Sequence, residues 1–406
     1  MRGKIALGLK EALRLTLEAI EPLPAENVTL VDSVDRVAAS DLNALVDSPL
    51  VDVSRKDGYA VVYREVEDAA PDSPVRLRLI GSAAAGGVGG INLEPGATVR
   101  VLTGARIPVG ADAVVAEEFT HREGDDVFVE AGPTEPGRNV LPGGSDVYCG
   151  QRVLESGRRI SPSMAGFLAA AGHNMIPVVG RPRVGIVGTG DEIVEPGTPL
   201  TEGRLYASNI ITLAGWCERY ALESRMAIVK DDYEAITATF RKMSAETDVM
   251  ITSGGAWTGD RDMVSGVLEG LGWRKVFHQV RIGPGKAVGF GILNKKPVFI
   301  LPGGPPSNLI GFLEIALPGL MALSGHKSFD LPRINAALGS EIVDGKADWT
   351  DFFFGTLTYG DELPVFYPMK KRSRLGSIAE ADAIAAIPEG HDSLPKGSVI
   401  SVQLLT

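Results

Sequence analysis

Hydrophobic and polar positions recur along this chain with two different periods. Near the N-terminus, Leu9, Leu13 and Leu17 stand four residues apart, which predicts an amphipathic helix over residues 8–20 that packs against a partner surface. From about residue 27 to 145, short β runs alternate with glycine and proline, which predicts a small β-rich domain. These runs are Asn27–Val31, Arg76–Ile80, Thr98–Leu102, Ala113–Glu117 and Asp126–Glu130.

Residues 161–173 predict a second helix with clear ends. Ser161 is a suitable N-cap, Pro162 suits the first helical position, and Gly172 suits the stop. Each of these residues satisfies or tolerates the backbone geometry that a helix end imposes, so the boundaries are predicted along with the helix.

The region from 182 to about 325 changes to alternating strands and helices. Strand, helix, strand in this order predicts a mostly parallel, doubly wound sheet covered on both faces. The last 75 or so residues return to a β pattern, which predicts a C-terminal β domain. The predicted strands are Val184–Val187, Asp248–Thr252, Pro297–Leu301, Phe352–Thr356, Pro364–Tyr367, Ala383–Ile387 and Ser398–Leu404, and the predicted helices are 207–220, 232–245, 262–271 and 307–323.

Composition narrows the functional class. The formal net charge of −11 disfavours nucleic acid as a partner, because phosphate backbones require a basic face. The one basic run, Lys370–Arg374, is interpreted as a solvated loop or a local anion contact. Two cysteines form no metal pair, and five histidines show no metal-ligand spacing, so a zinc site is not expected.

The chain shows no pattern that targets it to a membrane. The N-terminus lacks the long apolar run of a signal peptide, and no stretch of about 18 apolar residues is seen. We therefore expect a cytoplasmic protein with no membrane partner.

Candidate chemistry gathers where the predicted parallel strands end. Ligands of open parallel sheets bind beyond the carboxyl ends of the strands, and here these ends run into glycine-rich loops. Glycines let backbone amides approach an anion closely, and a following helix N-terminus favours negative charge. Several such loops on one edge indicate a phosphate-bearing or oxyanion ligand, although tight strand-to-helix turns are the alternative. The loops are Gly188–Glu192, Ser253–Asp262, Gly283–Lys286 and Pro302–Ser307.

Carboxylates follow the same strand ends. Glu192, Asp231 and Asp262 repel one another there unless a cation lies between them. Mg²⁺ suits such a place because it takes oxygen ligands and shares phosphates with one or two carboxylates. Helix N-terminal capping is the alternative for Glu192 and Asp262. Trp257, at the tip of a glycine loop, either stacks on a ring or caps the loop.

These motifs together resemble one family over nearly the whole length of the chain. The sequence is similar to the molybdopterin molybdenumtransferases, namely the bacterial MoeA type and the E domain of gephyrin. The residues that carry the resemblance are Asp57–Ala60, Thr103–Ala105, Gly110–Val114, Thr189–Glu192, Tyr206, Ser208, Asn209, Asp231–Asp232, Ser253–Gly255, Gly259, Asp262, Pro284–Lys286, Leu301–Gly303 and Pro305.

The resemblance implies an elongated protomer of four domains that forms a homodimer. It implies a helical or extended N-terminal domain that serves dimerisation, a small β-rich domain, a molybdopterin-binding α/β domain and a C-terminal β-barrel-like domain. In this sequence their expected bounds are, in the same order, 1–26 with 45–55 and 143–179; 27–44 with 56–142; 180–327; and 328–406.

The resemblance also implies an activity in molybdenum cofactor biosynthesis. The expected enzyme is a transferase that inserts molybdate into adenylylated molybdopterin with release of AMP, using Mg²⁺, and that meets a molybdopterin adenylyltransferase as partner. We expect Asp57, Asp262 and Lys286 in catalysis and Glu192 and Asp231 on the metal. The residues expected to bind the pterin nucleotide are Thr103, Gly188, Thr189, Gly190, Ser253, Gly254, Gly255, Gly285, Pro302, Gly303 and Pro305.

Some basic residues that the family usually has are missing here. Gly283 and Gln279 stand where the resemblance leads us to expect lysines, and the run after Asn139–Val140 lacks basic side chains. Loss of such contacts weakens anion binding unless Lys286 and Arg281 compensate. Two alternatives therefore stay open: a divergent member that binds the pterin nucleotide as a carrier or scaffold, and a member that uses tungstate.

Overall fold

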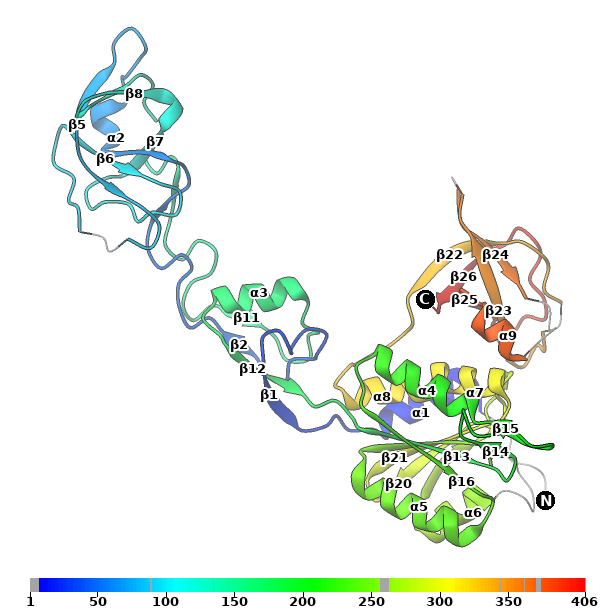
Figure 1. Cartoon of the computed structure of the whole chain (residues 1–406). Helices are drawn as coiled ribbons and strands as arrows, with labels where there is room; N and C mark the ends of the chain where they lie inside the picture. The colour runs from blue at the N-terminus through cyan, green and yellow to red at the C-terminus, as the bar shows by residue number, and fades with distance from the viewer. Residues whose placement is uncertain are drawn as a thin grey trace. The chain divides into compact units, whose positions relative to one another are not determined.

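The chain divides into two compact units. A computed structural model describes all residues except 1–6, 88–89, 134, 256–262, 344, 361, 370–373 and 406. One unit is Asn27–Val178, and the other combines Met1–Glu26 with Val179–Thr406. Figure 1 shows a β-rich domain in the first unit, and an α/β domain with a C-terminal β domain in the second.

The β-rich domain of Asn27–Val178 is a single six-stranded sheet with the strand order β7-β4-β6-β5-β9-β8. All neighbours pair antiparallel except β5 and β6, which run parallel. The sequence predicted β5, β6, β7 and β9; it missed β4, a fully buried four-residue strand, and β8, whose residues are all polar. The elements are β4 (Gly58–Val61), α2 (Tyr63–Val66), β5 (Val75–Ala83), β6 (Ala97–Val101), β7 (Ala113–Ala116), η1 (Glu117–Phe119), β8 (Thr120–Glu123) and β9 (Asp126–Val129).

Three two-stranded ladders and one helix complete this unit. The predicted helix ends are confirmed: the Met164 amide donates to Ser161 Oγ at 3.1 Å, and Gly172 has a φ of +93°, which favours glycine. The ladders pair β1 with β12, β2 with β11, and β3 with β10. The elements are β1 (Ala25–Thr29), β2 (Leu42–Asn43), β3 (Val53–Ser54), β10 (Val140–Leu141), β11 (Arg152–Leu154), α3 (Pro162–Ala170) and β12 (Met175–Val179).

The α/β domain is built on a six-stranded sheet with the order β16-β13-β17-β21-β20-β18. The first four strands run parallel, as predicted, and β20 and β18 extend the sheet antiparallel. The sequence analysis missed β16, β18 and β20. The strands are β13 (Val184–Thr189), β14 (Ile193–Val194), β15 (Leu205–Tyr206), β16 (Ser224–Val229), β17 (Val249–Ser253), β18 (Arg274–His278), β20 (Gly289–Leu293) and β21 (Lys296–Leu301).

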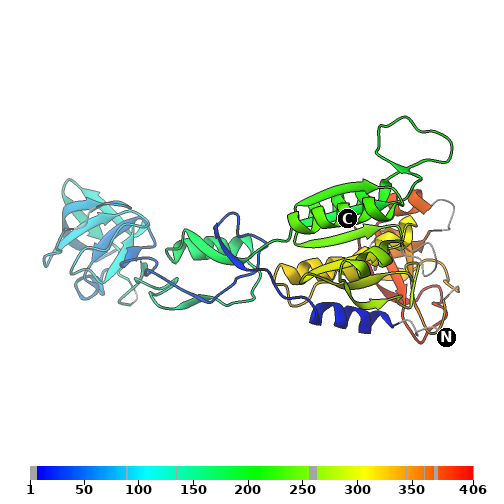
Figure 2. The same ribbon diagram turned by 90° about the horizontal axis from the view of Figure 1, so that it is seen from below.

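Helices cover both faces of this sheet (Figures 1 and 2). Strand residues alternate between two cores: Ile186, Ile251 and Phe299 belong to the core under α1, α4, α7 and α8, and their neighbours face α5 and α6. The helices are α1 (Leu9–Glu18), α4 (Ser208–Arg219), α5 (Tyr233–Glu246), α6 (Met263–Gly270), α7 (Pro305–Gly311), the π-helical turn η2 (Phe312–Ala316) and α8 (Leu317–Leu323).

Elements α7, η2 and α8 form one continuous helix, Pro305–Leu323, that is long and apolar enough to cross a membrane by length and composition. It is not an uninterrupted apolar stretch, since it contains polar residues such as Asn308 and Glu314, but its mean hydropathy is 1.4. Because 83% of that window is buried inside the protein, the helix has the surroundings of a core helix. Its π turn ends two residues before Pro318, which lacks an N–H to bond the carbonyl four residues earlier.

The C-terminal domain is a closed barrel in which β23, β24, β22, β26 and β25 pair in turn and β25 pairs again with β23. Strand β19 leaves the α/β domain and pairs with β23, so the two domains share a strand contact. The expected C-terminal β-barrel-like domain is confirmed. The elements are β19 (Ile282–Gly283), β22 (Arg333–Leu338), β23 (Thr350–Thr358), β24 (Val365–Pro368), α9 (Arg374–Ala379), β25 (Ala383–Ile387) and β26 (Val399–Leu404).

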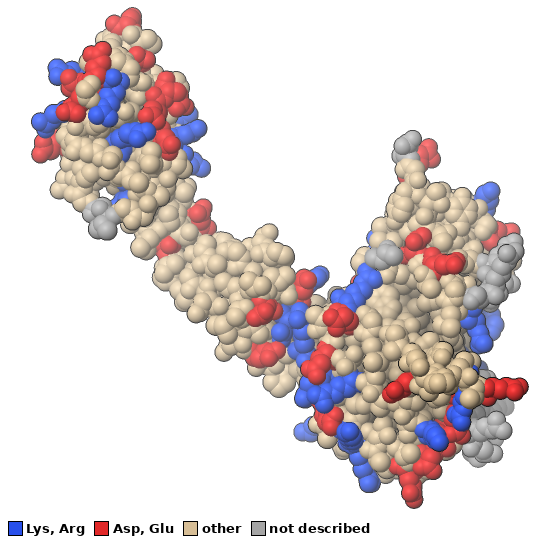
Figure 3. Space-filling view, viewed as in Figure 1, with Lys and Arg blue, Asp and Glu red and all other residues tan. Residues whose placement is uncertain are grey.

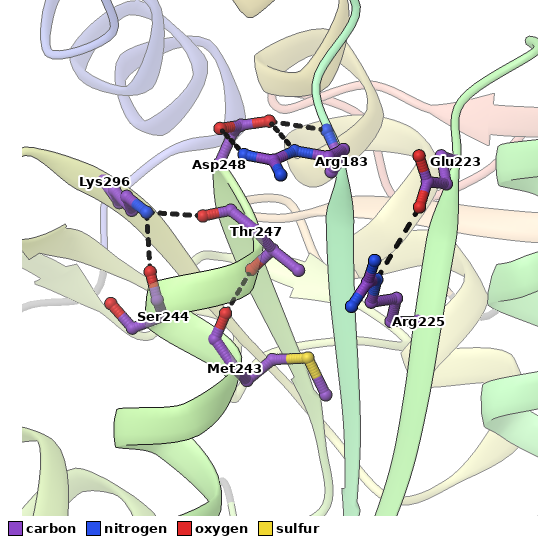
Figure 4. A network of polar contacts seen from close by, with 8 residues as sticks. All are labelled: Arg183, Glu223, Arg225, Met243, Ser244, Thr247, Asp248 and Lys296. Carbon is purple, nitrogen blue, oxygen red and sulfur yellow. Dashed lines mark hydrogen bonds and ion pairs between the residues drawn. The ribbon is translucent and has the colours of Figure 1, made fainter.

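Charged side chains form hydrogen bonds at the amino ends of the parallel strands (Figure 4). Arg183, before β13, donates from Nε and Nη2 to the two carboxylate oxygens of Asp248, before β17, at 3.1 and 3.0 Å. Lys296, which begins β21, donates from Nζ to the carbonyls of Ser244 and Thr247 at 2.6 Å, at the C-terminal end of α5. This edge of the sheet therefore uses its charges for stability.

Glu314 is a buried acid within the π turn, and we expect it to make stability depend on pH. Burial raises the pKa of Glu314 to about 7, against a hydrogen bond from Gln403 and the charge of Arg333, with Asp330 adding to the rise. Its Oε1 has no hydrogen-bond partner among the described residues. Because the folded state binds the proton more tightly, this stabilisation is present at low pH and is lost as pH rises through about 7.

Glu314→Gln should remove this dependence. Relative to the variant, the native chain should lose on the order of 3 kcal/mol of unfolding free energy between pH 5 and 8. Guanidinium unfolding followed by tryptophan fluorescence measures it, since all four tryptophans lie in the Val179–Thr406 segment. Parallel pH curves for the two proteins would contradict the prediction.

Candidate functional site

A cavity of about 750 Å³ opens at the carboxyl ends of the parallel strands. Its polar floor consists of the segments that follow β13, β17 and β21, and this is where open parallel sheets bind their ligands. The structure brings together seven of the predicted site residues in its lining: Gly188, Thr189, Glu192, Ser253, Gly254, Gly303 and Pro305.

The floor loops approach one another backbone to backbone. Gly254 has a φ of +102°, and a Cβ on it would lie 2.5 Å from the Thr189 carbonyl oxygen. A Cβ on Gly303 would in turn lie 3.7 Å from the Gly254 Cα. Only glycine fits at position 254, and its absence of a side chain leaves backbone groups facing the cavity.

Two asparagines tie the loops to the helices behind them. Asn209 Nδ2 donates to the Gly303 carbonyl at 2.8 Å and to Ser253 Oγ at 3.1 Å. Asn308 Nδ2 donates to the Pro302 carbonyl at 2.9 Å and to the same Oγ at 3.1 Å. The sequence analysis missed Asn308; the available signal was an amide side chain in the first turn of an apolar helix.

Two helices begin at this floor. Helix α4 follows Ala207, and the long helix follows Gly304; in the described residues neither start has a side-chain cap. Residues of both starts, Ser208 and Pro305 among them, line the cavity. The first two residues of the long helix, Pro305 and Pro306, have no N–H, so this helix contributes mainly its dipole. Helix α4 contributes its dipole and the amides of its uncapped first turn, and both helices favour negative charge, so the floor suits an anion.

Carboxylates lie beside the floor. Glu192 lines the cavity, with its carboxylate folded over Gly190. The pKa of Asp231 is raised, first by burial and then by the negative charges of Asp191 and Glu192. Capping is the wrong interpretation for Glu192, because β14 and not a helix follows it, whereas the neighbouring Asp232 does cap α5.

This arrangement suits a cation that is bound jointly by carboxylates and by the phosphates of a ligand, more than a cation that only protein side chains surround. Among the residues that the structure describes, no group of three or more His, Cys, Asp or Glu side chains is placed to hold a metal. One or two carboxylates with ligand phosphates are nevertheless the usual surroundings of Mg²⁺. The predicted residue Asp262, with Asp260 and Trp257, lies outside the described residues.

The other side of the cavity is apolar and partly basic. Leu200, Leu205 and Tyr206 line it from the segment around β14 and β15. Arg374 and Leu375 line it from α9 of the barrel. Arg374 ends the basic run that was interpreted as a solvated loop or a local anion contact, and its position at the cavity favours the anion contact.

Lys286 is not among the described residues that line the cavity. Its Nζ lies 5.7 Å from the centre of the Trp349 ring, which Lys346 approaches to 4.6 Å. Gly283, where a lysine was expected, leaves no room for a side chain, since a Cβ would lie 2.0 Å from Asp351 Oδ1. Five other predicted residues are likewise not among the described residues that line the cavity: Gly190, Gly255, Gly285, Pro302 and Asp231.

Asp57 and Thr103 meet in the Asn27–Val178 unit. The Thr103 amide and hydroxyl both donate to Asp57 Oδ1, at 2.7 and 2.8 Å. The amide bond is the main reason that the pKa of Asp57 is lowered, and the hydroxyl bond adds to it. The pair is exposed, so it presents a fixed, ionised carboxylate at the surface of this unit.

Three family models cover most of the chain. "MoeA N-terminal region (domain I and II)" matches residues 7–172, "Probable molybdopterin binding domain" matches 185–322, and "MoeA C-terminal region (domain IV)" matches 342–405.

Several curated relatives match over nearly their full length. Molybdopterin molybdenumtransferase 2 of Mycobacterium tuberculosis (strain H37Rv) is 30% identical over 98% of this chain and 99% of its own. Molybdopterin molybdenumtransferase of Bacillus subtilis is 30% identical over 100% and 95%. The crystal structure of the molybdopterin biosynthesis MoeA protein from Pyrococcus horikoshii OT3 superposes with a TM-score of 0.82, at 29% identity, over 98% of this chain and 100% of that one.

The close approach of Gly254 to the Thr189 carbonyl leads to a testable prediction. We expect Gly254→Ala to lower the affinity for inorganic pyrophosphate at least about tenfold, because the added methyl group displaces the floor amides. Isothermal titration calorimetry measures this. The control is Gly266→Ala in α6, where a Cβ meets nothing within 4 Å. Equal affinities in the two variants would contradict the anion-binding role of the floor.

Proposed function

This chain belongs to the MoeA-type molybdopterin molybdenumtransferase family, and we propose that it inserts molybdate into adenylylated molybdopterin with release of AMP. It is thus a transferase of molybdenum cofactor biosynthesis. One observation supports the finer proposal: the cavity floor joins glycine backbone, the uncapped N-terminus of α4 and the dipole of the long helix, which suits the pyrophosphate and oxyanion of these substrates.

The floor can hold the phosphates without a lysine-rich pocket. Backbone amides at helix N-termini act as fixed partial positive charges that need no reorganisation during the reaction. Arg374 adds the one full positive charge in the described lining of the cavity. Charge from both sources stabilises the AMP phosphate as the bond between its phosphorus and the bridging oxygen of the pyrophosphate breaks.

Glu192 and Asp231 are the residues that we propose for Mg²⁺. The fit rests on their chemistry, because both side chains offer hard oxygen donors. Burial is the main cause of the raised pKa of Asp231, and the negative charges of Asp191 and Glu192 add a repulsion that a cation relieves. When bound there, Mg²⁺ supplies positive charge that offsets charge on the phosphates of the substrate and of the leaving AMP.

We propose a catalytic role for three further residues, namely Asp57, Asp262 and Lys286. Asp57 has the ionised state that a hydrogen-bond acceptor or general base requires, because Thr103 lowers its pKa. In this state it can orient the attacking oxygen of the oxyanion.

A carrier role is the second candidate. Arg374 is the one basic side chain among the described residues that line the cavity. A protein with such a site can hold the pterin nucleotide through amides and ring contacts and still bind the free oxyanion too weakly for its insertion. Tungstate in place of molybdate is a further variant of the transferase.

We also propose a homodimer that meets a molybdopterin adenylyltransferase. Leu45, Val46, Leu50 and Tyr148 are exposed hydrophobic residues on segments joined by the Ser48–Val147 bridge. On the face that Figure 3 shows, few charged residues lie around α3 in the same unit. Exposed apolar side chains gathered with few charges are typical of a protein interface.

An assay of substrate turnover distinguishes a transferase from a carrier protein. AMP release from adenylylated molybdopterin should require Mg²⁺ and one oxyanion, either molybdate or tungstate. Tight nucleotide binding with no release in either oxyanion would support the carrier.

Glu192→Gln and Asp231→Asn should each lower the rate of AMP release roughly 100-fold or more, and should shift the Mg²⁺ concentration that gives half the rate. The matched control is Glu195→Gln, an exposed glutamate three residues away that does not line the cavity. An unchanged Mg²⁺ dependence in both variants would contradict the assignment of these carboxylates as Mg²⁺ ligands.

The dimer proposal predicts that Leu50→Glu yields monomers, because it places a charge within the apolar group. Light scattering coupled to size exclusion measures the mass. Leu363→Glu is the control, since Leu363 is also exposed and lies in the barrel domain. A native monomer, or a Leu50→Glu dimer, would contradict it.

A further inference from the structure

The cavity has a second side whose chemistry the phosphates do not explain. Four large hydrophobic residues that line it are between 42% and 61% exposed: Leu200, Leu205, Tyr206 and Leu375. We call this set the apolar rim. Exposed hydrophobic side chains gathered at one cavity are typical of a surface that a ligand covers.

Part of the rim is fixed by backbone hydrogen bonds. The Leu205 amide donates to the Glu192 carbonyl at 2.7 Å, and the Ala207 amide donates to the Val194 carbonyl at 2.9 Å. These bonds tie Leu205 and Tyr206 to the loop that carries Glu192, while the segment between β14 and β15 forms a projecting loop (Figure 2). Rim and floor are therefore positioned together.

Tyr206 presents its ring and not its hydroxyl as a free group. Its Oη donates to the Thr198 carbonyl at 3.0 Å, so the polar end of the side chain is already used within the loop. The ring lines the cavity and offers a flat surface for stacking.

The barrel supplies the last member of the rim. Leu375 lies in the first turn of α9, and α9 packs against α7, the helix whose N-terminus forms part of the floor. Phosphate-binding and apolar surfaces thus meet within one cavity, whose volume of about 750 Å³ admits a ligand with both kinds of group.

We propose that the apolar rim binds a planar heteroaromatic ring of the ligand, stacked on Tyr206 and covered by Leu205 and Leu375, while the phosphates lie on the floor. This inference rests on the proposed function and deepens it. The ring is either the adenine or the pterin of the substrate; both are flat, and the shared chemistry is stacking on an apolar surface.

The test compares ligands with and without a ring on the full chain in the presence of Mg²⁺. AMP and ribose 5-phosphate carry the same phosphate, and 6-hydroxymethylpterin carries the other ring. Tyr206→Ala should lower the affinity for one ring-bearing ligand about tenfold and leave ribose 5-phosphate unchanged. Tyr206→Phe, which keeps the ring, should retain the native affinity.

The contribution of the barrel to ring binding is tested by a matched pair of leucine variants. Leu375→Ser should lower the same affinity, whereas Leu363→Ser, an equally exposed leucine of the barrel that does not line the cavity, should not. A loss for AMP alone identifies adenine, and a loss for the pterin alone identifies that ring; either supports the proposal.

Two results would overturn it. Equal losses for AMP and ribose 5-phosphate in Tyr206→Ala would mean that the loop shapes the floor and binds no ring. Full affinity for both rings in Tyr206→Ala would mean that the rim contacts neither. Failure of the native protein to bind AMP, ribose 5-phosphate and pyrophosphate is a different result, because it removes the anion-binding floor and with it the proposed function.

Discussion

The site depends on one constraint: backbone must meet backbone at the carboxyl edge of the sheet. Gly254 has to approach the Thr189 carbonyl so closely that a methyl group on it would lie within 2.5 Å of that oxygen. Once no side chain separates the loops after β13, β17 and β21, their amides and the starts of α4 and α7 can share one anion. Asn209 and Asn308 each bond to Ser253 and to a carbonyl of Pro302–Gly303, so they tie the ends of β17 and β21 together.

The two edges of the sheet use polarity in opposite ways. At the amino edge, Arg183 is paired with Asp248, and Lys296 is satisfied by carbonyls at the end of α5, so charge there stabilises the fold. At the carboxyl edge, burial and then the negative charges of Asp191 and Glu192 raise the pKa of Asp231. Buried, perturbed carboxylates of this kind cluster at functional sites, and the cation that we propose here would supply the missing positive charge.

The structural features that could be predicted from the sequence depend on interactions between residues close together along the chain. The cap at Ser161, the buried strands β13, β17 and β21, and the glycines at their ends depend on residues near in sequence, and the structure agrees with each. Strands β16, β18 and β20 were missed. Pairing with β13, about 40 residues earlier, decides β16, whereas β20 and β18 extend the sheet antiparallel through near neighbours and do not follow the strand–helix alternation that was sought. Arg374 and Leu375 could not be assigned to the cavity from sequence, because only the packing of α9 against α7 brings them there.

The barrel is therefore part of the site, and the long helix is what connects them. Pro305 at its start belongs to the cavity floor, whereas Glu314, in its π turn, accepts a hydrogen bond from Gln403 of the barrel strand β26. Strand β19 provides a second link by pairing with β23. Because the same barrel carries Arg374 and Leu375, any shift of the barrel along this helix changes the cavity's positive charge and its apolar rim together. The helix that begins at the floor also packs against the barrel, so one element holds both sides of the cavity that we propose for the phosphates and the ring.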